Sequence, residues 1–157
     1  MHNQQPTATP GMHMGAGGGN RNTKNKPYDS HGKREWTNGI CDCFGDILTC
    51  CIASWCPCIV YSQNRSRYEH LEQRGYPHPS GGDACSSDCF LHGLLTGCCG
   101  LGWVLQIGNR ERIRNRYKID GGCFGDCMAS LCCNPCALTQ ESRELELEEH
   151  SMVPPKN

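Results

Sequence analysis

Two uncharged, strongly apolar stretches alternate with charged stretches along the middle of the chain. The first covers residues 47–61 and contains Pro57, which lacks a backbone donor and predicts a kink or the end of a helix near Cys56. We therefore expect a short helix, a Cys-Pro-Cys corner, and a second helix that continues through Arg65 and Arg67. At fifteen residues, this stretch is shorter than the ~20 that a helix needs to cross a bilayer.

The second apolar stretch covers residues 89–107, which are nineteen residues without a formal charge. It is the only stretch of the sequence long enough to span a membrane as one helix. Gly93 and Gly97 form a small-x-x-x-small pair that permits close helix packing. We expect a glycine-rich apolar helix here.

A basic run follows the second apolar stretch immediately. Beside a hydrophobic segment, such a run is typical of the cytoplasmic side and of contact with anionic lipid headgroups, at about 1 kcal/mol per base. A solvated helical face is an alternative of equal weight. The candidate headgroup contacts are Arg110, Arg112, Arg114, Arg116 and Lys118.

The positions of the bases also bear on topology. Bases follow both apolar stretches, whereas two successive full spans would place the two following loops on opposite sides of the membrane. We therefore expect a peripheral or re-entrant arrangement on the cytoplasmic face, with the plasma membrane favoured. A single span over residues 89–107 is the alternative.

The chain contains a degenerate internal repeat. Cys-Phe-Gly-Asp occurs at residues 43–46 and again at residues 123–126. The pairs Cys50-Cys51 and Pro57-Cys58 likewise have counterparts in Cys132-Cys133 and Pro135-Cys136. This pattern predicts a mainly α fold: a small Cys-rich helical domain in which two pseudo-repeated helix-turn elements flank the glycine-rich apolar helix.

Composition sets the limits of this domain. All fifteen cysteines lie between Cys41 and Cys136. Residues 1–32 are rich in Gly and Asn and predict a disordered tail; residues 33–148 form the Cys-rich domain, and residues 149–157 form a C-terminal tail. The basic residues before position 36 and the glutamates of residues 141–149 are expected to be solvated.

Charge and targeting signals narrow the function further. The net charge of -1 argues against a nucleic-acid binder, and the N-terminus shows no secretory signal. In the reducing cytosol the thiols would stay mostly free, metal-bound or acylated.

The density of thiols points to soft-metal chemistry. Zinc and similar soft divalent ions take several deprotonated cysteines at ~2.3 Å. Alternatives are that these small apolar side chains simply pack, or that they are S-acylated. A nucleophilic cysteine needs a histidine base positioned beside it, and no spacing in the sequence singles out such a pair. We therefore expect that the protein is not an enzyme. The candidate metal ligands are Cys50, Cys51, Cys56, Cys58, Cys132, Cys133 and Cys136, of which Cys56, Cys58, Cys133 and Cys136 are favoured.

Three motifs resemble the placenta-specific-eight and cornifelin family, which includes plant cadmium-resistance and cell-number-regulator proteins. They are Cys-Cys-x4-Cys-Pro-Cys at residues 50–58, the Arg-Ile-Arg-x-Arg-Tyr run at residues 112–117, and Pro-Cys-Ala-Leu-x-Gln-Glu at residues 135–141. The resemblance implies a small Cys-rich membrane-associated protein without known catalytic residues. In plants it implies cadmium or zinc handling and control of cell number, and in animals regulatory roles and a cornified-envelope component.

Together, these observations predict a non-catalytic, membrane-associated Cys-rich protein in soft-metal homeostasis or transport, with membrane lipids as its partners. The alternative is a regulatory or structural interaction protein anchored by S-acylation, without metal. A chain this short would form a pore only as a homo-oligomer.

Overall fold

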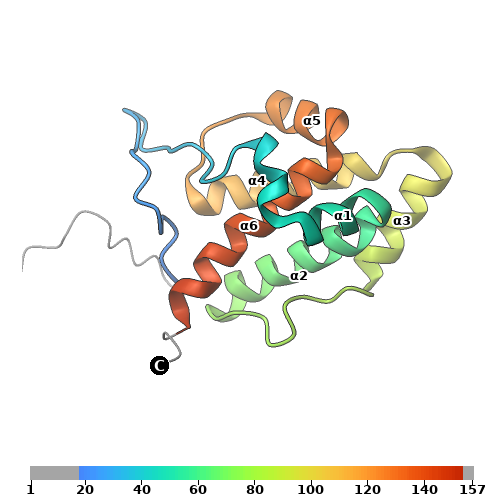
Figure 1. The fold of residues 1–157 in the computed structure, drawn as a ribbon, viewed down its shortest axis with the longest axis horizontal. Helices are drawn as coiled ribbons and strands as arrows, with labels where there is room; N and C mark the ends of the chain where they lie inside the picture. Colours follow the sequence, from blue (N-terminus) through green and yellow to red (C-terminus); the bar gives the residue numbers. More distant parts are fainter. Residues whose placement is uncertain (1–17, 154–157) are drawn as a thin grey trace, which may run out of the picture.

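The computed structural model describes residues 18–153, which form a mainly helical fold as predicted (Figure 1). Of the predicted disordered tail, residues 1–17 lie outside the described part, and Gly19 and Asn20 hydrogen-bond to Glu148 and Ser151 near the end of the last helix. The elements are η1 (Ile40–Asp46), α1 (Ile47–Trp55), α2 (Pro57–Arg74), α3 (Ser87–Cys99), α4 (Gly102–Tyr117), α5 (Cys123–Cys132) and α6 (Asn134–Met152).

Helix α6 is the central element. It packs against α1, α2, α5 and η1, and Figure 1 shows it crossing the middle of the molecule beside α2. The apolar core around it lies in two clusters. One comprises Tyr68, Leu71, Ile113, Tyr117, Ile119 and Leu145, and the other comprises Ala53, Val60, Tyr61 and Leu138.

The two copies of the internal repeat form the same helix-corner-helix shape. Cys56 ends α1 with φ -136° and ψ 70°, and Cys133 ends α5 with φ -144° and ψ 76°. Each corner is followed by a proline in the first turn of the next helix, where its missing N–H costs nothing. The predicted pair of helix-turn elements is therefore confirmed.

The segment between the two repeats differs from the expectation of one glycine-rich helix. Gly100 ends α3 in the left-handed conformation, with φ +64°, and the chain turns before α4 begins at Gly102. Residues 89–107 are thus shared between two helices. Within the described residues, length and composition qualify no single helix for crossing a bilayer, while η1–α1 and α2 pass only as a pair bent by 117°.

Three of the five glutamates of α6 are buried rather than solvated, which corrects the expectation from the sequence. Glu141, Glu144 and Glu148 are each 2% exposed or less and share one face of the helix. Arg34, also buried, donates to Glu144 Oε1 at 2.5 Å, and its backbone pairs with that of Ile119. The N-terminal segment is therefore fastened to α6 by a buried ion pair.

Candidate functional site

Four free thiols lie together where the start of α2 meets the start of α3. Cys56 and Cys58 come from the Cys-Pro-Cys corner, Cys89 from the first turns of α3, and Cys85 from the loop before it. Gly93 permits the close approach of the two helices, because a Cβ built there would lie 3.7 Å from Cys58 Sγ. We call these four cysteines the corner thiols.

Hydrogen bonds fix the loop that carries Cys85. Ser62 on α2 donates to the Asp83 carbonyl at 2.6 Å, and its Oγ lies 2.7 Å from Ser86 Oγ. Ser86 in turn accepts from the Asp88 N–H as the N-cap of α3. The Ser62 hydroxyl therefore holds the start of α3 against α2.

The corner thiols interact electrostatically. Burial first, then a hydrogen bond to Cys58 and the nearby Cys58, Cys85 and Cys56 sulfurs, together raise the pKa of Cys89 to about 11. Negative charge on these sulfurs is therefore mutually unfavourable unless a cation joins them. Within residues 18–153 no three His, Cys, Asp or Glu side chains stand at metal-ligand spacing, so joint coordination requires these thiols to turn toward one another.

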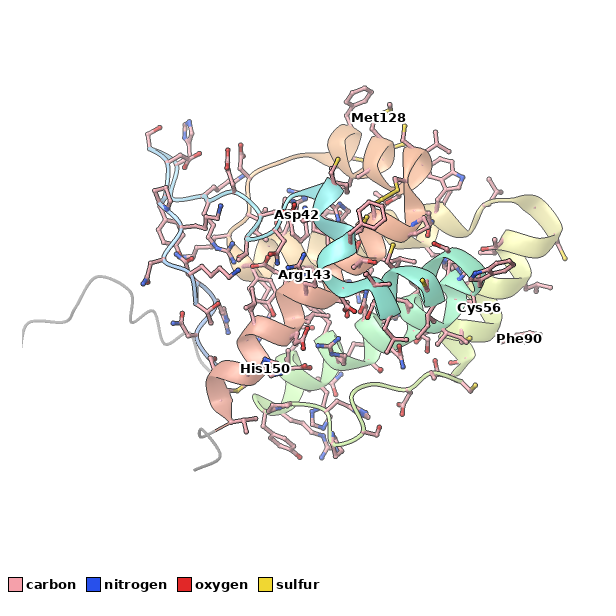
Figure 2. The ribbon with its side chains drawn as sticks, viewed as in Figure 1. Asp42, Cys56, Phe90, Met128, Arg143 and His150 are labelled. Carbon is pink, nitrogen blue, oxygen red and sulfur yellow. A yellow bond between two sulfur atoms is a disulfide. The ribbon has the colours of Figure 1, made fainter. Side chains whose placement is uncertain are left out.

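A second group of sulfurs lies at the corner between α5 and α6. Cys133 and Cys136 form a disulfide, drawn as a yellow bond in Figure 2. The buried Cys43 has its Sγ 3.6 Å from Cys136 Sγ. Burial raises the pKa of Cys50, and its contact with Cys43 raises it further. We call these four cysteines the disulfide cluster.

The structure divides the predicted metal ligands between these two groups. Cys56 and Cys58 belong to the corner thiols, whereas Cys50 belongs to the disulfide cluster with Cys133 and Cys136. In the structure Cys133 and Cys136 are joined to each other as a disulfide, and in this state neither offers a thiolate to a metal. Cys51 and Cys132 are exposed.

The sequence-based set also lacked three cysteines. In the sequence, Cys85 and Cys89 are related to each other by i,i+4 spacing, but no sequence pattern indicates that they lie near Cys58. Cys43 belongs to the repeated Cys-Phe-Gly-Asp motif, but only the packing of η1 on α6 brings it beside Cys136.

Three of the five bases predicted to contact headgroups pair with carboxylates of the protein. Arg110 lies 3.2 Å from Asp126 and 3.5 Å from Glu141, and Arg114 lies 2.7 Å from Asp126. Arg116 pairs with Glu148 at 2.8 Å. The remaining two, Arg112 and Lys118, are exposed.

Many large apolar side chains are exposed on η1, α1, α3, α5 and the start of α4. His150 lies near the C-terminal end of α6, and Figure 2 shows Phe90 and Met128 far from it. Trp55 is 87% exposed, and the two phenylalanines of the repeated motif, Phe44 and Phe124, are 76% and 81% exposed. We use the name apolar face for these exposed side chains taken together: Phe44, Ile47, Leu48, Trp55, Phe90, Leu91, Leu94, Leu101, Val104, Phe124, Met128 and Leu131.

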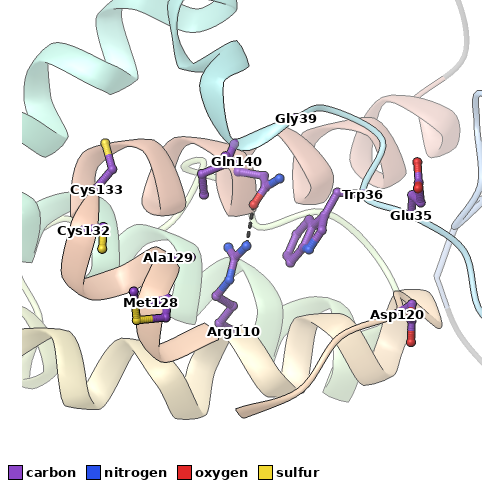
Figure 3. Close-up of a pocket in the computed structure, with 11 residues that line it drawn as sticks. Glu35, Trp36, Gly39, Arg110, Asp120, Met128, Ala129, Cys132, Cys133 and Gln140 are labelled. Carbon is purple, nitrogen blue, oxygen red and sulfur yellow. Dashed lines mark hydrogen bonds between the residues drawn. The ribbon is translucent and has the colours of Figure 1, made fainter. Parts of the chain in front are cut away.

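A pocket of about 620 Å³ opens between α4, α5 and the start of α6 (Figure 3). Arg110 donates to Gln140 Oε1 at 2.5 Å, and its guanidinium lies 4.3 Å from the centre of the Trp36 ring. Met128, Cys132 and Cys133 line the opposite part of the wall. Cys133, one residue of the disulfide, therefore borders a space that a small molecule can enter.

Comparison with known proteins identifies the family. The PLAC8 family model matches residues 36–144. The chain is 33% identical to "Protein PLANT CADMIUM RESISTANCE 2" of Arabidopsis thaliana, over 78% of this chain and 74% of that protein. It is 34% identical to "Protein PLANT CADMIUM RESISTANCE 1" of the same plant, over 74% of this chain and 70% of that protein.

A maize relative, "Cell number regulator 11", is 33% identical over 71% of this chain and 63% of its own length. The chain thus spans less than two thirds of that relative. No solved structure matches this chain. Because the family model covers η1 and the helices up to the middle of α6, both repeats and both thiol groups lie within it, and the chain belongs to the PLAC8 family.

Proposed function

We propose that this chain is a non-catalytic, membrane-associated protein that binds a soft divalent cation such as zinc or cadmium at the corner thiols. The observation that carries the proposal is the meeting of four free cysteines, Cys56, Cys58, Cys85 and Cys89, from two packed helices. Four thiolates in tetrahedral arrangement are a preferred ligand set of such ions. The names of the cadmium-resistance relatives agree with this choice of ion.

The exposure of the corner thiols suits an exchangeable ion. Cys56 and Cys85 are exposed, and Cys58 and Cys89 are half-buried, so an ion reaches them from solvent. Since the pKa of Cys89 is raised to about 11, this thiol is protonated at neutral pH and must release its proton when the ion binds. Affinity should therefore rise with pH.

The proposed membrane association rests on the apolar face. Twelve large apolar side chains there are at least 43% exposed, including Trp55 and the two repeated phenylalanines. An uncovered set of this size is unusual for a monomeric protein in water and fits insertion into the interfacial region of a bilayer. We infer a peripheral or re-entrant arrangement, in which the bent pair of η1–α1 and α2 lies at the membrane surface and the corner thiols stay accessible from the aqueous side.

The experiment is equilibrium dialysis of the detergent-solubilised protein against cadmium, with the Cys133–Cys136 disulfide intact and oxygen excluded. We expect about one tightly held ion per chain. The variant C56S/C58S should lose it, while the matched control C98S/C99S, which removes two exposed thiols at the other end of α3, should keep it. Equal retention by both variants would remove the corner thiols from the proposal.

A second candidate function is a regulatory or structural interaction protein that S-acylation anchors to membranes. The adjacent exposed thiols Cys98 and Cys99, which lie beside Leu101 of the apolar face, favour it. Carbonate extraction with and without hydroxylamine separates the candidates. Release only after thioester cleavage supports acylation, whereas release in both cases contradicts stable membrane anchoring.

A further inference from the structure

The disulfide joins two cysteines at the first turn of a long helix. Cys133 is the N-cap of the nineteen-residue α6, and Cys136 is three residues further on, in the sequence Cys-Asn-Pro-Cys. No side chain caps this helix end. Unpaired N–H groups and the helix dipole therefore face the disulfide, an environment that stabilises thiolates.

The two sulfurs of the disulfide have different surroundings. Cys133 lines the pocket of about 620 Å³, so small solutes reach it. Cys136 is directed toward η1, where the Sγ of Cys43 lies 3.6 Å away. Cys43 is only 5% exposed, so its thiol has contact with the disulfide but little with solvent.

We propose that Cys133, Cys136 and Cys43 form an internal thiol–disulfide exchange relay. In the forward step the Cys43 thiolate attacks Cys136 Sγ, the Cys133–Cys136 bond breaks, and a Cys43–Cys136 bond forms. Cys133 leaves as a thiolate and takes up the proton that Cys43 gave up. One disulfide is consumed and one is formed, so the step needs no external oxidant or reductant.

The step changes the chemical state of Cys133 in the wall of the pocket. Before it, Cys133 is a disulfide sulfur; after it, Cys133 is a free thiol at a helix N-terminus, in the wall of the pocket that Met128 and Trp36 also line. The new bond would also link η1 of the first repeat to α6 of the second. Cys50 lies in contact with the Cys43 thiol, where its S–H can donate a hydrogen bond to the Cys43 sulfur.

The test uses metal-free, full-length protein in detergent, so its result does not depend on whether the corner thiols bind cadmium. In the variant C133S, oxidised glutathione converts Cys136 to the mixed disulfide and releases glutathione. Cys43 then attacks Cys136 and releases the second glutathione. After acid quenching and alkylation, peptide mass spectrometry should find the Cys43–Cys136 disulfide at roughly tenfold or more over glutathionylated Cys136, because the attack is intramolecular.

Two variants control this result. C132S removes the exposed neighbouring thiol and should leave the Cys133–Cys136 disulfide and its exchange unchanged. C43S/C133S lacks the attacking thiol, so Cys136 should keep its glutathione. Stable glutathionylated Cys136 in C133S, without a bond to Cys43, overturns the relay.

Mapping the wild-type disulfide keeps the proposal testable even if C133S fails to fold. Acid-quenched wild-type protein should contain a Cys43–Cys136 fraction matched by an equal fraction of alkylated Cys133. C43S should lack both. A wild-type protein in which every disulfide is Cys133–Cys136, at all pH values up to 9, contradicts the proposal.

Discussion

At the scale of single residues, buried charge decides much of this fold. Arg34 and Glu144 are both almost fully buried, and Thr37 adds two bonds to the same carboxylate, from its backbone N–H at 3.2 Å and its hydroxyl at 2.8 Å. Removing one partner of such a pair leaves the other charge without compensation in a low dielectric. The pair therefore acts as a structural fastener between the N-terminal segment and α6.

The first prediction concerns this fastener. Glu144→Ala should lower the free energy of unfolding by about 3–5 kcal/mol, because Arg34 would be left buried and unpaired. Urea unfolding followed by circular dichroism measures the change. Glu146→Ala is the control, because that side chain is 46% exposed two positions along the same helix; a loss in E144A no larger than in E146A would rule out the fastener.

The second prediction is a pH dependence caused by Glu141. Burial raises the pKa of this carboxyl to about 7, against the lowering effect of Arg110, Gln106 and Asn109. The unfolded chain releases this proton near pH 4.3, whereas the folded chain keeps it until about pH 7. Between these values the folded state binds more protons, so the Glu141 contribution lowers stability as pH rises through this window.

Urea midpoints measured from pH 4.5 to 7.5 test this prediction. The wild type should lose stability relative to Glu141→Gln across the window, and the difference between the two curves should level off above pH 7. Parallel curves would show that the Glu141 carboxyl does not titrate in this window.

The sequence shows the residues of this network but not their partners. The excess of glutamate in α6 and of arginine in α4 is visible in the sequence, and a solvated tail and a lipid-facing helix are the usual interpretation of such runs. The i,i+3,i+7 spacing of Glu141, Glu144 and Glu148 is the one signal that these acids share a face. Which charge faces which depends on tertiary packing between α4 and α6.

At the scale of elements, the two corners follow from local chemistry. Pro57 cannot continue α1, and the same rule applies at Pro135, so both corners could be placed from the sequence. The break at Gly100 could not, because a glycine in an apolar run is equally compatible with close helix packing and with a left-handed C-cap. For the same reason the sequence alone overestimated the length of the helix after residue 89.

The third prediction concerns the apolar face. Trp55→Ala should weaken binding to phosphatidylcholine–phosphatidylserine vesicles by roughly tenfold to a hundredfold, because burying a large apolar side chain contributes about 1.5–3 kcal/mol. Trp55 is 87% exposed and contributes little to the folded core. Vesicle cosedimentation provides the measurement.

Tyr28→Ala is its matched control, because this aromatic side chain is 42% exposed on the N-terminal segment, outside the apolar face. It should leave vesicle binding unchanged. Equal binding by W55A and the wild type would show that α1 does not contact lipid.

At the scale of the whole molecule, the duplication yields two corners with different chemistry. The first corner places Cys56 and Cys58 against α3 and its additional thiols, whereas the second closes its own Cys133–Cys136 disulfide beside η1. The sequence was sufficient to predict both corners and the richness in thiols. It could not assign each cysteine to a group, because that depends on which helix packs on each corner.

The measurement that tests the central proposal most directly is X-ray absorption at the cadmium edge, on protein with the Cys133–Cys136 disulfide intact. The proposal predicts a first shell of sulfur alone, with about four neighbours, that C98S/C99S preserves and C56S/C58S abolishes. A shell dominated by oxygen or nitrogen, or a sulfur shell that C56S/C58S leaves unchanged, would contradict a soft-metal site at the corner thiols.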